Sequence, residues 1–245
     1  ISHINHPGDW LNSNANHNIV NDAASISFFG DLILKYDSCL GIEILNERNG
    51  TTGYDRILWD NLLMYTLPYG KNVIGFSNTD AHDVYNLDTS FSVFMMEENT
   101  EKNIELTMQS GAFFGITRDL RANEFDIGPS KAIEAVGTDL AYPMFTEISV
   151  DGHSITVTAT DSTTLQWIAN GEVIYTADVT SGQPVTINLD EIDGVEDFLY
   201  VRAELIGEGG MCVSQAFVLD DGSAPLEREE ASFFDSRIRP LKELF

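Results

Sequence analysis

The sequence predicts an α/β fold that forms part of a (β/α) barrel, followed by a small all-β sandwich of immunoglobulin-like type. In the first third of the chain, apolar runs of strand length alternate with segments whose apolar residues recur at helical spacing, as in parallel βαβ units. From Phe145 to Leu219, short alternating strands and turns follow one another without a helical period. We therefore assign residues 1–142 to the C-terminal part of a barrel, 143–222 to the sandwich and 223–245 to a C-terminal tail.

The α/β part is expected to begin with three parallel strands joined by two helices. Each apolar run ends at turn residues. Examples are Pro7-Gly8 after the first strand and Pro68 with Gly70 before the third. A further strand, a helix that ends at Gly111 and another strand then continue the alternation. The expected strands are 1–7, 39–45, 73–76, 91–96 and 112–117, and the expected helices are 28–36, 53–67 and 100–110.

The sandwich prediction comes from strand count and turn chemistry. About seven short strands are separated by glycine-containing turns, which is the pattern of a small immunoglobulin-like module. Trp167 and Phe198 are expected in its core. The turn signals are Asp151-Gly152, Asn170-Gly171, Ser181-Gly182 and the glycines between 207 and 210.

Charge limits the partners that the chain can bind. With 13 Lys and Arg against 39 Asp and Glu, the formal net charge is −26, which repels nucleic-acid phosphates and anionic lipid surfaces. Residues 143–224 hold 14 of the acidic residues and a single basic one, Arg202. No apolar run approaches the roughly 18 residues that would span a bilayer. Cys39 and Cys212 fall in different predicted domains, so we expect no disulfide framework.

Side chains with metal-binding chemistry follow two of the predicted strands. Asp80 and His82 come just after the apolar run Val73–Phe76, two positions apart, so in extended geometry they would project to the same side. His6 stands at the end of the first strand. A carboxylate and imidazoles at the carboxyl ends of parallel strands suit a divalent metal. The alternative is a polar turn in which Asp80 caps the next segment.

Several motifs together resemble the PHP (polymerase and histidinol phosphatase) superfamily of metallohydrolases, in particular the branch that includes carbaryl-hydrolase-like proteins. The resemblance covers nearly the whole chain, and its most specific parts are the HP and D-x-H motifs in this order. The similar stretches are INHPG at 4–8, GIEILN at 41–46, LWDNLL at 58–63, NTDAH at 78–82, SGAF at 110–113 and IGP at 127–129.

The resemblance implies a metal-dependent hydrolase with a distorted seven-stranded β/α barrel. By motif match, His6, Asp80 and His82 would be ligands of zinc, manganese or iron. The expected substrate is a small-molecule phosphoester, or a carbamate or carboxylic ester. Hydrolysis would use a metal-activated water. Glu43 and Asn78 are expected to support the ligands, and Asp9, Trp10 and Tyr85 to border the substrate pocket; no catalytic residue is assigned.

The chain also departs from the family pattern. The ligand motifs that precede the HP motif in the family are not present, so we expect a truncated and inactive portion that holds one ion or none. A half-barrel would leave strand edges unpaired, which predicts a homo-oligomer through those strands. His3, three residues before His6, is expected to point to the opposite side. His17 and His153 are expected to be structural.

Two other interpretations remain open from the sequence. The chain could be a non-catalytic binding or interaction module with a degenerate metal site, or a different amidohydrolase with a rearranged ligand set. In the tail, Phe233, Phe234, Ile238 and Leu241 suit docking onto a domain. The sequence indicates neither the compartment nor the substrate.

Overall fold

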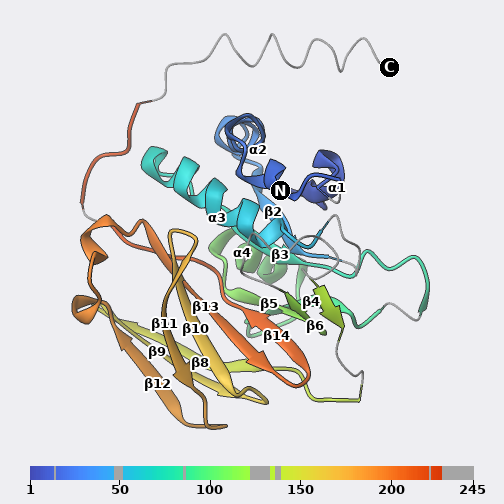
Figure 1. Cartoon of the computed structure of the whole chain (residues 1–245), viewed down its shortest axis with the longest axis vertical. Helices are drawn as coiled ribbons and strands as arrows, with labels where there is room; N and C mark the ends of the chain where they lie inside the picture. The colour runs from blue at the N-terminus through green and yellow to red at the C-terminus, as the bar shows by residue number, and fades with distance from the viewer. Residues whose placement is uncertain are drawn as a thin grey trace.

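The computed structural model describes residues 1–13, 15–46, 52–84, 87–121, 133–135, 139–220 and 222–227. The helices and the first three strands lie on one side of the molecule, and the sheets of the C-terminal half lie on the other (Figure 1). In this part of the chain, no helix is long and apolar enough to cross a membrane.

The N-terminal part is a parallel three-stranded sheet in the order β1-β2-β3, as the alternation of strand and helix patterns predicted. Asp22 caps α2 by accepting hydrogen bonds from the backbone N–H groups of Ala24 and Ser25, so this helix begins earlier than its apolar pattern suggested. The elements are β1 (Ser2–Ile4), α1 (Pro7–Leu11), η1 (His17–Asn21), α2 (Ala23–Lys35), β2 (Cys39–Leu45), α3 (Asp55–Thr66), η2 (Leu67–Tyr69) and β3 (Ile74–Ser77).

Burial explains why β2 is central. Six of its seven residues are buried, and apolar residues of α2 and α3, such as Ile33 and Leu58, belong to the same core cluster as Ile42 and Ile44. Gly41 allows β2 to approach β3 closely, because a Cβ at this position would lie 1.9 Å from the carbonyl oxygen of Ile74. The chain thus packs its first core around a strand with two covered faces.

The rest of the described chain is antiparallel. A large sheet has the order β11-β10-β13-β14-β5-β4, with β15 paired to β13; a second sheet has the order β12-β9-β8, and β6 pairs with β7. The elements are β4 (Ser90–Phe94), α4 (Glu101–Ser110), β5 (Phe113–Thr117), β6 (Asp119–Arg121), β7 (Ile133–Ala135), β8 (Met144–Asp151), β9 (Ser154–Thr160), β10 (Thr164–Ala169), β11 (Glu172–Asp178), β12 (Pro184–Asn188), η5 (Leu189–Glu191), η6 (Val195–Asp197), β13 (Tyr200–Gly207), β14 (Gly210–Val213) and β15 (Phe217–Val218).

The predicted (β/α) barrel is therefore wrong. Parallel pairing ends at β3, and the described residues contain no closed barrel. The strand-helix-strand pattern of β4, α4 and β5 suggested another parallel unit, but β4 and β5 are antiparallel neighbours. The helix between them explains the error: Thr107 is the one buried residue of α4, and Leu106 is 51% exposed. A helix without a buried apolar stripe cannot cover a sheet as a crossover connection does.

The two antiparallel sheets share a second core. Trp167 is fully buried there, as predicted, and Phe198 packs against the cluster while half-buried. The immunoglobulin-like assignment is not confirmed, because β4 and β5 join the large sheet through β14 from outside the predicted sandwich. The boundary between residues 142 and 143 stays a prediction, but the large sheet continues across it.

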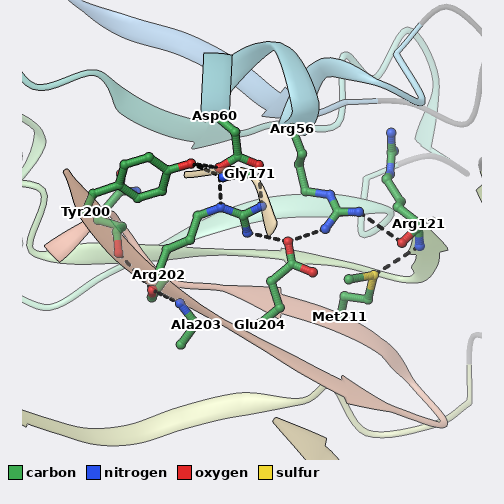
Figure 2. A network of polar contacts seen from close by, with 11 residues as sticks. Arg56, Asp60, Arg121, Gly171, Tyr200, Arg202, Ala203, Glu204 and Met211 are labelled. Carbon is green, nitrogen blue, oxygen red and sulfur yellow. Dashed lines mark hydrogen bonds and ion pairs between the residues drawn. The ribbon is translucent and has the colours of Figure 1, made fainter. Parts of the chain in front are cut away.

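A buried ionic cluster joins α3 to β13 (Figure 2). The Arg202 guanidinium donates from Nε to Asp60 Oδ1 and from Nη2 to Asp60 Oδ2, both at 2.7 Å. Arg56 and Arg202 both donate to Glu204 Oε1. The Tyr200 hydroxyl donates to Asp60 at 2.5 Å. All five side chains are at most 5% exposed, so each charge is held by a partner rather than by water.

The pairing sets the protonation states of the cluster. Burial acts to raise the pKa of Glu204, but the guanidinium groups of Arg56 and Arg202 outweigh it and lower this pKa to about 2. Burial acts to lower the pKa of Arg202, but Asp60 and Glu204 raise it well above its usual value. Burial and the Asp60 carboxylate raise the pKa of Tyr200. At neutral pH Glu204 is therefore ionised and Arg202 keeps its charge.

The ionised Glu204 is predicted to stabilise the fold above about pH 4.5, its ordinary pKa, and to lose this effect as the pH falls towards about 2. The free energy of unfolding, measured with urea, should be lower for Glu204→Gln than for the wild type at pH 6. The difference in unfolding free energy between the wild type and Glu204→Gln should shrink by about 3 kcal/mol as the pH falls from about 4.5 to about 2. The exposed Glu208→Gln variant is the control. A difference between wild type and Glu204→Gln that is equal at pH 6 and pH 3 would contradict the assignment.

Candidate functional site

Polar side chains from three strands meet at the carboxyl edge of the parallel sheet. His6 follows β1, Glu43 and Asn46 lie at the end of β2, and Asn78 and Asp80 follow β3. Because the three strands run parallel, their carboxyl ends share one edge, where open α/β sheets bind ligands. Parallel pairing of the three strands is the condition under which residues at their ends come together, as predicted from the sequence.

Glu43 joins the three strand ends. It is 2% exposed. Its Oε2 accepts hydrogen bonds from the backbone N–H of His6 at 2.6 Å and from Asn46 Nδ2 at 2.7 Å, and its Oε1 accepts one from Asn78 Nδ2 at 2.6 Å. Three donors from three connections fix this carboxylate, which is the behaviour of a residue that positions a site.

His6 and Asp80 face each other across the site. His6 Nε2 lies 4.0 Å from Asp80 Oδ2, and both side chains are about one-third exposed. A nitrogen and an oxygen bound to one tetrahedral zinc ion at roughly 2.0–2.2 Å lie about 3.4 Å apart. His6 and Asp80 would therefore have to approach each other by roughly 0.6 Å to share one ion in that geometry.

The backbone at both residues is strained. His6 has φ 30° and Asp80 has φ 48°, in the left-handed region that most non-glycine residues avoid. Such conformations persist where the surrounding structure enforces them, and they gather at functional sites. Here the Glu43 hydrogen bond to the backbone N–H of His6 supplies part of that constraint.

His82, the third predicted ligand, does not join this pair. Its side chain is exposed, and its Nδ1 lies 2.7 Å from the backbone oxygen of Asp80 within the same loop. Among the described residues, no group of three or more His, Cys, Asp or Glu side chains is arranged to hold a metal ion. The structure thus assembles two of the three predicted ligands.

The predicted pocket residues lie beside His6. Asp9 Oδ2 is 3.8 Å from His6 Nδ1, and Trp10 is 70% exposed. Both belong to α1, which Pro7 starts directly after the strained His6. Tyr85 lies outside the described residues. Asp9 and Trp10 form an accessible rim next to the His6–Asp80 pair.

His3 also contacts the site, and the expectation that it points away from it was wrong. Its Nε2 lies 3.4 Å from Asn78 Nδ2, and its ring stacks on Phe76 at 4.3 Å between ring centres. Burial lowers the pKa of His3 although Glu43 acts to raise it. Strand alternation does not relate the two histidines, because β1 ends at Ile4 and the chain turns at His6, so they do not share one extended segment.

Asp55 is a buried carboxyl group behind the same turn, and no motif or spacing in the sequence singles it out. Its pKa is raised well above the usual value, mainly by burial. The Arg121 guanidinium and the Gly8 backbone N–H act in the opposite direction, and Glu43 and Asp9 raise the pKa further. An acidic residue in the first turn of a helix normally serves the helix dipole, which hides this role in the sequence.

No protein-family model, no curated protein and no solved structure matches the chain.

Asp55→Asn is predicted to stabilise the protein at pH 8 in the presence of a chelator. Because the folded-state pKa of Asp55 is raised, the folded state holds this proton more tightly than the unfolded chain, and stability falls as the pH rises above about 3.8. The amide of the variant cannot ionise. Its free energy of unfolding, measured with urea, should therefore equal that of the wild type near pH 4 and exceed it increasingly as the pH rises.

The control for this experiment is Asp139→Asn, at an exposed position. An offset between Asp55→Asn and the wild type that does not change between pH 4 and pH 8 would show that the buried carboxyl group does not titrate as described.

Proposed function

We propose that the chain carries the site of a metal-dependent hydrolase that acts on phosphoester, carbamate or carboxylic ester bonds. The observation that carries the proposal is the His6–Asp80 pair, 4.0 Å apart at the carboxyl ends of parallel strands. The motif resemblance to PHP metallohydrolases supports the choice of ester substrates. The donor set of one imidazole nitrogen and one carboxylate oxygen suits zinc, manganese or iron(II).

The residues around the pair have separable roles in this proposal. His6 and Asp80 would hold the ion, which would supply a Lewis acid for the ester oxygen and an acidified water. Asp9, whose carboxylate lies 3.8 Å from His6 Nδ1, adds a negative charge beside the imidazole. Glu43 holds the backbone of His6. The exposed ring of Trp10 offers an apolar surface to the substrate.

A second candidate is a non-catalytic module with a degenerate metal site. The observation that favours it is the lack of a third ligand beside His6 and Asp80 among the described residues. Such a module would bind an ion weakly and would not turn over an ester. Metal binding and hydrolysis must therefore be measured separately.

The metal proposal predicts that chelator-stripped protein binds one Zn²⁺ or Mn²⁺ ion per chain by calorimetry, and that His6→Ala and Asp80→Asn abolish binding. Glu43→Gln should weaken it by about 10- to 100-fold, because the support of His6 is lost. The exposed Asp83→Asn variant is the matched control.

His82→Ala tests the third predicted ligand, since a loss of binding would show that its loop closes onto the ion. Hydrolysis of p-nitrophenyl phosphate and p-nitrophenyl acetate by the loaded protein then separates the two candidates. Binding without turnover supports the degenerate module. No binding by the wild type would exclude a metal site of this composition.

We also propose that a second copy of the chain pairs with the parallel sheet. The β3 edge is capped at Gly75, whose N–H and C=O bond to the Gln215 side chain at 2.9 and 2.7 Å. The outer edge of β1 has no strand partner among the described residues. Light scattering of the wild type should give the mass of a dimer. The His3→Pro variant, which lacks a backbone donor in β1, should have a smaller dimer fraction. A monomeric wild type would contradict this proposal.

A further inference from the structure

An apolar groove of about 380 Å³ lies at the end of β3 opposite the candidate site. Ile74, at the start of β3, forms part of its wall, together with residues 110–114, 145–148 and 214–217. Phe113, Phe145 and Phe217 are among its aromatic lining. The groove thus belongs to a different surface from the one that carries His6 and Asp80.

An edge strand lines part of the groove. Four consecutive residues of β8, from Phe145 to Ile148, line it. The pairing of β8 with β9 shifts register between Phe145 and Glu147, so the side chains of this stretch do not alternate strictly between two faces. In the described part of the chain, β8 pairs with β9 alone. Such an edge accepts an added strand.

The groove also presents apolar side chains to solvent. Met95 is 54% exposed, although it lines the groove. Ile148, on β8, is 37% exposed. Phe114 and Phe145, which also line the groove, meet at 5.7 Å between ring centres and belong to the core that the two sheets share. Exposed apolar side chains in a groove that reaches a core suit an apolar segment as their cover.

We propose that this groove is the docking site for residues 228–245 of the same chain. These residues lie outside the described part, and their sequence supplies the matching chemistry: Phe233, Phe234, Ile238 and Leu241 are apolar. The backbone N–H of Leu226 donates to the oxygen of Pro68 at 2.9 Å, so the described chain ends beside Pro68. Asn72, four residues after Pro68, lines the groove.

The length of the chain favours this occupant. Phe233 comes six positions after Glu227, and this stretch spans about 20 Å when extended. A tethered segment is present at an effective concentration in the mM range for short linkers. Residues 228–245 hold four basic and four acidic residues, so the segment is close to neutral and can approach the acidic sheets without strong repulsion.

The test uses the full chain with ¹³C-methyl methionine and NMR. Replacement of both aromatic residues, Phe233→Ser with Phe234→Ser, is expected to shift the Met95 methyl resonance towards that of a free methionine. Ile238→Ser with Leu241→Ser should shift it in the same direction. The resonance of Met64, which packs against the other core, should not move. Glu229→Gln with Glu230→Gln is the matched control in the same segment.

An unchanged Met95 resonance in the Phe233 and Phe234 variant would overturn the proposal. Docking within one chain also requires that the wild-type Met95 resonance does not change on dilution. A resonance that moves on dilution would overturn it in favour of docking between two copies. A shift of Met95 and Met64 together would show that the substitutions disturb the whole fold, which also contradicts a local docking site.

Discussion

The fold depends on the buried pairing of two arginines with two carboxylates between α3 and β13. Arg202 binds Asp60 through two nitrogen atoms, and Glu204 accepts from both Arg56 and Arg202. Removal of one partner from such a pair typically costs about 3–5 kcal/mol, because the remaining charge stays buried. α3, the helix of the first core that carries Arg56 and Asp60, can therefore pack on the large sheet in only one register. In that register each charge meets its partner.

The same cluster leads by hydrogen bonds to the candidate site. Its Arg56 donates to the backbone oxygen of Arg121 at 2.9 Å, and Arg121 donates to the backbone oxygen of Asn46 at 2.6 Å. Asn46 in turn donates to Glu43, which holds the backbone of His6. The position of the metal-binding candidates is thus tied to the sheet through side chains that do not take part in binding.

The sequence predicted the local part of this arrangement and missed the part set by distant contacts. Apolar spacing gave the three parallel strands, and strand ends brought His6 and Asp80 together. The weakly apolar α4 was mistaken for a crossover helix, which produced the barrel prediction. Asp55 and the ionic cluster were not found, because the partners Arg56 and Glu204 are 148 positions apart and no periodicity connects them. Charge pairing over such a distance has no local signature.

The separation of these partners also has a consequence for biosynthesis. Asp60 meets Arg202 across 142 positions, so a ribosome must complete most of the chain before the charges on α3 can be neutralised. Contacts of this range slow folding and leave partly folded chains exposed. We expect the nascent N-terminal segment to need chaperone protection. A fragment cut between residues 142 and 143 would leave Arg56 and Asp60 without their partners on β13, and co-expression of both halves should be required for either to accumulate.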